Sequence, residues 1–372
     1  MNISEIRSIH DGPFKLVFVS SGGGGSAISD LLKVPGASQT VLESYIPYSR
    51  ESMDEYLGFK PSHYCGLQTT VNMAVTAFNR AKKLASDIDP SNLLGVAVTA
   101  TLSTTYEKLG SHRFFVCIHS SDATHVISSY LTKGKRTRSS EEELVTECLE
   151  SLIGIVCGVN NELPKLTQKI EYEVFNSKPE WNALESGKKS LIHGSLQPSK
   201  LIFPGTFNPL HEGHKRIQEI AEKKTKMPAT YEISIGNVEK TLLSYFEIHK
   251  ILDQFQPDDR WALTNAPTFA DKADIFKDST FVLGMDTLIR MFDEKFYSDR
   301  KQMLESIDAF NTNDVNFIVF GRKIDDIYKT LDQASIPSRI IDRFDGIPES
   351  EFRLDISSRE IKKDQEENKI PA

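Results

Sequence analysis

The sequence predicts a two-domain α/β protein. At 372 residues, the chain is longer than the size at which a single hydrophobic core keeps growing. In both halves, short apolar runs alternate with stretches in which apolar residues recur every three or four positions, as strands and helices do. Between the halves this periodicity weakens. We therefore expect one domain over residues 1–158, a linker over 159–199 and a second domain over 200–372.

The first half begins with a strand, a glycine-rich loop and a helix. An apolar run at 14–19 breaks into two serines and four glycines, and apolar residues return at helical spacing from Ile28. The segment 140–156 opens with capping-box spacing and continues with apolar residues three and four apart, which predicts a helix with one buried face. Further strands are expected at 93–98, 114–118 and 126–131.

The second half repeats this alternation. The linker is rich in turn-forming and polar residues, apart from an alternating run at 170–175 that predicts one strand. An apolar run at 201–203 then enters a tight loop, after which Ile217, Ile220 and Ala221 share one helical face. Later strands are expected at 231–235, 281–284, 316–321 and 339–341. Strands that alternate with helices predict a parallel, Rossmann-like sheet.

Composition narrows the class of partner. A net charge of −8 is unfavourable for a surface that coats nucleic acid, because such binding uses clustered Lys and Arg. The four cysteines form no C-x-x-C pair and the histidines outside 211–214 form no ligand-spaced cluster, so we expect neither a disulfide framework nor a protein-only metal site. No apolar stretch approaches membrane-spanning or signal-peptide length. We expect a protein of the cytoplasm, with the nucleus as a further location. Its expected partners are small molecules, and a homo-oligomer is an alternative to a monomer.

Two histidines at the start of the second domain carry the chemistry. His211 and His214 are three residues apart where the tight loop meets a helix, so both rings can face the same side, and Gly213 leaves room for a phosphate to approach. The N–H groups and dipole at a helix start favour an anion there. Imidazoles can donate hydrogen bonds to phosphoryl oxygens that gain charge during displacement. This pattern predicts a polyphosphate site at which the protein positions reactants and stabilises charge.

These residues resemble the signature of a known superfamily. An apolar strand followed by Gly-Thr-Phe-Asn-Pro (205–209) and His-Glu-Gly-His (211–214) resembles the HxGH signature of the nucleotidyltransferases. Near the C-terminus, Asp-Ile-Ser-Ser-Arg-Glu-Ile-Lys (355–362) is similar to the family's ISSTxIR element, which holds the β and γ phosphates of the nucleotide. Arg359 stands where the family usually has Thr, and Lys362 where it usually has Arg. Lysine keeps the charge but loses the bidentate geometry of arginine.

The resemblance covers roughly residues 201 to 362 and is strongest to nicotinamide mononucleotide adenylyltransferases. It implies transfer of AMP from ATP to a phosphorylated acceptor, with nicotinamide mononucleotide favoured, release of pyrophosphate, and Mg²⁺ bound with the nucleotide. A cytidylyltransferase, a phosphopantetheine adenylyltransferase and a nucleotide-binding regulator with residual ATPase activity are the alternatives. The implied catalytic residues are His211, His214 and Lys362; the implied nucleotide-binding residues are Gly205, Thr206, Phe207, Gly213, Lys240, Asp286, Arg322, Ser357, Ser358 and Arg359.

The first domain resembles a second family, the CinA C-terminal domain of nicotinamide-nucleotide amidohydrolases. The resemblance rests on Ser21 with its glycines, on Val-Pro-Gly-Ala-Ser (34–38) and on Tyr-Ser-Arg-Glu (48–51). It places the catalytic serine on Ser21 and the family's lysine on Met53, whose thioether cannot accept a proton. The family's glycine loop falls near 99–103, where this sequence has no glycine. We expect a degenerate relative without amidase activity, unless Lys60, Lys82 or Lys83 supplies the base.

Overall fold

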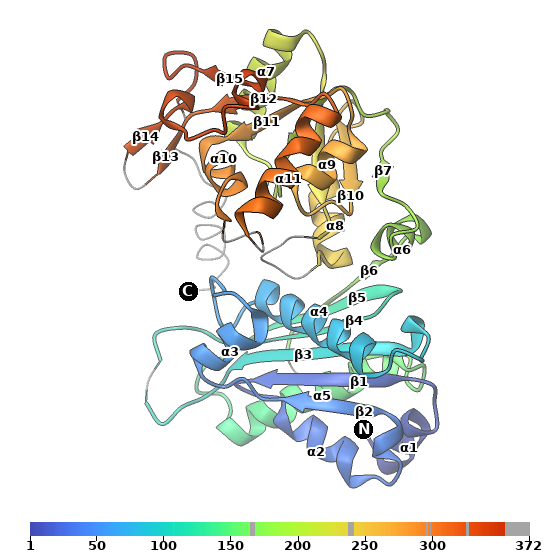
Figure 1. Ribbon diagram of the computed structural model, residues 1–372. Coiled ribbons are helices and arrows are strands. Elements are labelled where there is room, and N and C mark those ends of the chain that lie inside the picture. The colour runs from blue at the N-terminus through green and yellow to red at the C-terminus, as the bar shows by residue number, and fades with distance from the viewer. Residues whose placement is uncertain are drawn as a thin grey trace. The chain divides into compact units, whose positions relative to one another are not determined.

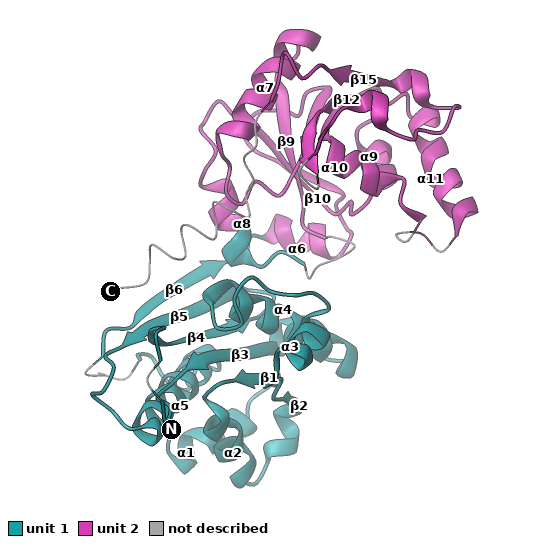
Figure 2. Cartoon of the chain, turned by 90° about the vertical axis from the view of Figure 1, so that its left-hand side faces the viewer, with its two compact units in different colours: residues 1–178, 239–247, 370–372 teal, residues 179–238, 248–369 magenta. Residues whose placement is uncertain are grey.

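The computed structural model describes residues 1–106, 108–163, 168–236, 242–294, 297, 299–324 and 327–353. They form two compact units, which are coloured separately in Figure 2. Unit 1 holds the described residues up to Lys178 together with 242–247, and unit 2 holds the others. The division falls inside the expected linker, and that stretch also supplies regular elements to both units. These are β6 (Glu171–Asn176) in unit 1, and α6 (Pro179–Glu185) and β7 (Leu191–His193) in unit 2.

Unit 1 is built on a six-stranded sheet in the order β2-β1-β3-β4-β5-β6. β2, β1 and β3 are parallel, whereas β4, β5 and β6 are added antiparallel. The central strands are buried along almost their whole length, as expected for strands that are covered on both faces. The strands are β1 (Lys15–Ser21), β2 (Val41–Tyr45), β3 (Leu93–Thr101), β4 (His112–His119) and β5 (Ala123–Leu131), with β6 as above.

Helices cover both faces of this sheet, with α4 on one face and α2 and α5 on the other (Figure 1). The last helix begins earlier than the sequence predicts, because its N-cap is Thr137 rather than Ser140. The Thr137 side chain accepts a hydrogen bond from the N–H of Ser140, so Ser140 lies in the first turn. The helices are α1 (Ile3–His10), α2 (Gly25–Lys33), α3 (Arg50–Leu57), α4 (Leu67–Leu84) and α5 (Arg138–Val156), with 3-10 turns η1 (Ala37–Gln39) and η2 (Pro90–Asn92).

Unit 1 also includes a short segment from later in the sequence. Residues 242–247 belong to its contacts rather than to those of unit 2. Phe246 is 4% exposed, and its ring centroid lies 5.1 Å from that of Phe175 on β6. The hydroxyl of Tyr245 donates a hydrogen bond to the carbonyl of Ser121 at 2.9 Å. The hydrophobic cluster beneath α4 is therefore completed by residues that are far from it along the chain.

Unit 2 is built on a seven-stranded sheet in the order β15-β12-β11-β8-β9-β10-β7. All neighbours are parallel except β7, which is added antiparallel at one edge. Numbered along the chain, the parallel strands have the order 3-2-1-4-5-6 of the doubly wound dinucleotide-binding fold. The predicted α/β class and parallel sheet are confirmed. The strands are β8 (Leu201–Pro204), β9 (Ala229–Ser234), β10 (Arg260–Thr264), β11 (Thr280–Gly284), β12 (Asn316–Phe320) and β15 (Phe344–Ile347).

The connections of unit 2 are mostly helical. Besides α6, its described helices are α7 (Glu212–Thr225), α9 (Phe269–Ile275), α10 (Met285–Met291) and α11 (Arg300–Thr312), together with α8 (Tyr245–Leu252), whose first turn is counted with unit 1. A small hairpin of β13 (Arg322–Ile324) and β14 (Ile327–Lys329) follows β12, and 3-10 turns η4 (Leu331–Gln333) and η5 (Ile341–Arg343) precede β15. Within the described ranges, every helix is too short or too polar to cross a membrane.

The prediction of a strand at 339–341 is wrong. Ile340 is 1% exposed, but its N–H bonds to the carbonyl of Pro337 and its carbonyl accepts from Arg343, so the chain turns here. Ile340 anchors this turn in the hydrophobic core, whereas Ile341 is 51% exposed. The sixth parallel strand is β15, which begins at Phe344.

Candidate functional site

The site residues of unit 2 gather where the strand order reverses. β8 lies between β9 and β11, so the helices after β8 and β11 leave the sheet in different directions, and ligands of such sheets bind beyond the carboxyl ends of these strands. His211 follows β8, Asp286 follows β11 and Arg322 follows β12. The Arg322 Nε lies 3.6 Å from Asp286 Oδ1, and its charge is close enough to lower the pKa of both histidines. The structure thus brings these predicted residues together.

His211 and His214 form a stacked pair at the start of α7. Their ring centroids are 3.7 Å apart and the planes differ by 21°. His211 is the N-cap, in extended conformation, and its backbone N–H donates to Nδ1 of His214 at 3.3 Å. A ring nitrogen that accepts in this way carries no proton, so the neutral His214 ring holds its proton on Nε2. His214 therefore presents an N–H donor from its other nitrogen.

The surroundings keep both imidazoles neutral near pH 7. Burial, then His211 and the Arg322 guanidinium, lower the pKa of His214 to about 3. Burial, then Arg322, also lowers the pKa of His211. Arg322 and Asp286 are each a little over 40% exposed, at 42% and 43%, so their ion pair remains open to solvent. The site combines neutral hydrogen-bond donors with an accessible guanidinium.

Gly213 makes room for the ring of His211. A Cβ at this position would lie 3.0 Å from Nδ1 and Cε1 of His211, so a side chain here would crowd the histidine ring. The approach of a phosphate to Gly213 stays a prediction. The same Nδ1 is buried and has no hydrogen-bond partner among the described residues. Buried polar atoms without partners are uncommon and are found at catalytic and ligand sites.

Phe207 and Gly205 shape the loop instead of facing a ligand through their side chains. Phe207 is fully buried and has a φ of +42°, in the left-handed region that few side chains adopt. Its ring packs edge-on against His214, with centroids 5.1 Å apart. A Cβ on Gly205 would lie 2.6 Å from the Phe207 ring, so only glycine fits there. The buried side chain of Phe207 thus supports the ring of His214, whereas Thr206 is exposed. Contacts of either residue with a nucleotide stay predictions.

Five predicted residues lie outside the described ranges, and one important residue was missed. The five are Lys240, Ser357, Ser358, Arg359 and Lys362. The missed residue is Gln254, whose side-chain amide accepts from the N–H of Leu210 at 2.7 Å and donates to the carbonyl of Phe207 at 2.9 Å. A single glutamine after a helix matches no motif, so no sequence signal could have identified it.

The described residues of the site include few carboxylates that could bind a divalent ion. In the part of the chain that is described, no group of three or more His, Cys, Asp or Glu side chains could hold a metal ion. The Asp286 carboxylate, which the resemblance places near the nucleotide, is engaged by Arg322. Mg²⁺ is commonly held by one or two carboxylates together with substrate phosphates.

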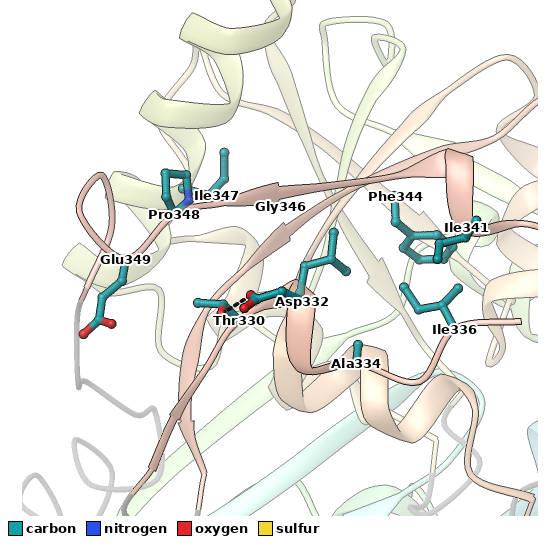
Figure 3. A pocket seen from close by; sticks show the side chains of 11 residues that line it. Thr330, Asp332, Ala334, Ile336, Ile341, Phe344, Gly346, Ile347, Pro348 and Glu349 are labelled. Atoms are coloured by element: carbon teal, nitrogen blue, oxygen red, sulfur yellow. Dashed lines mark hydrogen bonds between the residues drawn. The ribbon is translucent and has the colours of Figure 1, made fainter. Parts of the chain in front are cut away.

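A separate pocket of about 590 Å³ lies along the edge strand β15 (Figure 3). Its lining is largely apolar, and includes Leu331, Ile336, Phe344 and Ile347. It contains none of the predicted site residues. Thr330 and Asp332, which are hydrogen-bonded to each other, are among its polar lining residues. The lining includes no Lys, Arg or His, so the pocket lacks the cations and imidazoles that a polyphosphate requires.

The glycine loop of unit 1 is filled by the chain itself. The Glu142 carboxylate accepts from the N–H of Gly24 at 2.9 Å and from that of Ser26 at 3.4 Å, at the start of α2. The Ser21 hydroxyl donates to the carbonyl of Pro47 at 3.0 Å. Met53 is 1% exposed and lies in the hydrophobic cluster beneath α4. The helix start that could bind a phosphate is therefore already paired with a carboxylate.

Comparisons with known proteins extend to part of the chain. No family model and no curated protein matches the sequence. Among solved structures, a competence/damage-inducible protein, CihA, from Agrobacterium tumefaciens matches with 17% identity and a TM-score of 0.29, covering 41% of this chain and 94% of that one. A CinA superfamily protein from Escherichia coli matches with 14% identity and a TM-score of 0.30, covering 42% and 88%. A competence or damage-inducible protein from Enterobacter asburiae matches with 13% identity and a TM-score of 0.32, covering 41% and 95%. About 41% of the chain thus resembles proteins of the CinA family in structure.

Proposed function

We propose that unit 2 is a nucleotidyltransferase that transfers AMP from ATP to a phosphorylated acceptor and releases pyrophosphate. Nicotinamide mononucleotide is the acceptor that we favour, on the sequence resemblance. The observation that carries the proposal is the meeting of His211, His214 and Arg322 beyond the carboxyl ends of β8 and β12, next to the point where strand order reverses. A helix start, neutral N–H donors and a guanidinium together suit the phosphates of a nucleotide.

The reaction needs positioning and charge stabilisation rather than a covalent intermediate. A phosphate oxygen of the acceptor attacks the α-phosphorus of ATP, the new P–O bond forms, and the bond to the oxygen that bridges to the β-phosphorus breaks. Pyrophosphate leaves with that bridging oxygen. The Nε2–H of His214 is available to donate to an oxygen that gains negative charge, and a neutral ring with a pKa of about 3 holds this donor without losing a proton near pH 7.

Arg322 gives the site its positive charge. Its guanidinium lies beside Asp286 and remains partly exposed, so it can exchange the carboxylate for a phosphate without a large cost of desolvation. The histidines would then act on the transferred phosphoryl group and Arg322 on the charge of the polyphosphate. Mg²⁺ would enter with ATP and supply further charge neutralisation between the phosphates.

The direct test is a pyrophosphate-release screen with the full chain. ATP and CTP would each be incubated with Mg²⁺ and with nicotinamide mononucleotide, phosphopantetheine or a phosphorylated alcohol, and the products identified by mass spectrometry. We expect pyrophosphate only when an acceptor is present, with the dinucleotide product from ATP and nicotinamide mononucleotide. Release of phosphate from ATP without an acceptor would instead indicate a nucleotide-binding regulator. No nucleotide-dependent product with any pair would show that the proposal is wrong.

A further inference from the structure

The loop between β8 and α7 is held by one side chain from outside it. Phe207 and Leu210 are the first and fourth residues of the turn in this loop, and in an ordinary β-turn the carbonyl of the first accepts from the N–H of the fourth. Here both groups bond to the amide of Gln254 instead, at 2.9 and 2.7 Å. The amide also donates to the carbonyl of Ile251 at 3.3 Å, which ties it to the last turn of α8. Gln254 thus takes the place of the turn's own hydrogen bond.

We propose that Gln254 is a positioning residue that sets the geometry of His211 and His214 for catalysis. The kinetic part of this inference rests on the proposed nucleotidyl transfer. Leu210 directly precedes His211, whose N–H bonds to Nδ1 of His214, so the backbone that Gln254 holds leads into the bond that fixes the His214 tautomer. The ring of Phe207 packs edge-on against that of His214. Gln254 therefore acts on the histidine pair from both sides of the turn.

The left-handed conformation of Phe207 explains why the loop needs this support. A phenylalanine with a φ of +42° is strained, and such residues persist where surrounding contacts fix them. The bond from Gln254 to the Phe207 carbonyl and the burial of its ring are these contacts. Without the amide, the turn can close on itself or the phenylalanine can relax, and in either case the histidine rings move relative to each other.

The chemistry of the contact requires a neutral amide. One end must accept from the N–H of Leu210 and the other must donate to the carbonyl of Phe207. Methionine has a similar length but makes neither bond. Glutamate keeps an acceptor for Leu210 but places a negative charge against a carbonyl oxygen. Gln254→Met and Gln254→Glu therefore remove the contact in two graded ways, and Gln256→Met is the matched control, because Gln256 is exposed and two residues away.

The first measurement does not depend on any activity. Nitrogen-15 NMR of the histidine rings in the full chain, without nucleotide, reports the tautomer and pKa of His214, which the His211 ring and the Arg322 guanidinium face. We expect the parent and Gln256→Met to share one set of ring signals with a strongly lowered pKa. In Gln254→Met the pKa should move toward about 6.5 and the second tautomer should appear. Gln254→Glu should lie between them.

The second measurement is kinetic. For Gln254→Met we expect kcat for nucleotidyl transfer to fall by roughly 10- to 100-fold, because small displacements of catalytic groups are costly, while KM for ATP changes by less than about threefold. If the parent shows no acceptor-dependent transfer, the proposed function fails, and the NMR result still decides the role of Gln254. Unchanged ring signals in folded Gln254→Met, with or without a lower melting temperature, would overturn the inference. If that variant does not fold, Gln254→Glu provides the same decision.

Discussion

Both units contain a strand-glycine-helix arrangement, but the side chains at the helix start are acidic in unit 1 and are histidines with an arginine in unit 2. In each, a buried parallel strand runs through glycine into a helix: β1 into α2 in unit 1, and β8 into α7 in unit 2. At α2 the chain's own Glu142 carboxylate accepts from the helix-start N–H groups. At α7 the neighbouring groups are two neutral histidines and a guanidinium. A strand-glycine-helix pattern therefore indicates where an anion fits, and the groups that arrive from elsewhere decide whether a ligand is needed.

The largest expected effect breaks the site in unit 2. His214→Ala, and separately His211→Ala, should lower kcat for nucleotidyl transfer by on the order of a hundredfold or more, because each removes a donor to the transition state. Far-UV circular dichroism should stay unchanged. His193→Ala, on the edge strand β7, is the matched control and should retain parental kcat. Parental kcat in either site variant would refute the role given to that histidine.

A smaller effect is expected at the C-terminal element. Lys362→Ala should weaken ATP binding by roughly tenfold, as expected for one lost charge-assisted hydrogen bond to phosphate, whereas Lys362→Arg should bind at least as well as the parent. Isothermal titration with ATP and Mg²⁺ measures this. Lys363→Ala, one residue along, provides the control. Equal ATP affinity in Lys362→Ala and the parent would contradict the role that the resemblance implies.

In unit 1 the expected effect is on stability alone. Glu142→Ala should lower the free energy of unfolding by about 1–2 kcal/mol, because the helix start loses its acceptor, and Glu142→Gln should lose less. Glu143→Ala, whose side chain is exposed, should be close to neutral. Urea denaturation gives the three values, and nucleotidyl transfer should stay parental in all. Reduced transfer in Glu142→Ala would show that the two loops are not independent.

The smallest effect is expected for Ser21 in unit 1, and it tests whether that unit lacks amidase activity. Ser21→Ala in the full chain should leave nucleotidyl transfer unchanged, and neither it nor the parent should deamidate nicotinamide mononucleotide. The reason is that the Ser21 hydroxyl is bonded to a carbonyl and the position of the family's lysine is the buried Met53. Nicotinic acid mononucleotide that forms with the parent and disappears in Ser21→Ala would make unit 1 an active amidohydrolase. If no deamidation is seen, Met53→Lys is the variant with which to try to restore it.

The apolar runs of the sequence predicted the strands that are buried on both faces. β1, β3, β4 and β8 fall on predicted apolar runs because strands buried on both faces are continuously apolar. β10 was missed because it begins with half-buried Arg260 and Trp261, which break such a run. The strand predicted at 339–341 was wrong because an apolar pair does not by itself indicate a strand: Ile340 is buried in a turn and Ile341 is exposed.

Some residues of the candidate site could be predicted from the sequence and others could not. His211 and His214 could be predicted because their spacing, the preceding strand and the following helix are neighbours in sequence. Arg322 could be placed only through the resemblance, and the stacking of the two rings could not be predicted at all. Gln254 is 44 and 47 residues from its two partners, so its role exists only in the folded chain.

The inclusion of residues 242–247 in unit 1 has a consequence for synthesis. A ribosome makes the six strands of the first sheet well before it makes Phe246, so the nascent unit must wait with the ring of Phe175 uncovered. The gene cannot be divided by a single cut into two self-sufficient pieces, because the chain passes from unit 2 into unit 1 and back at 247–248. A fragment that ends at Lys178 should therefore be aggregation-prone, and supplying the missing segment through an engineered linker should restore its solubility.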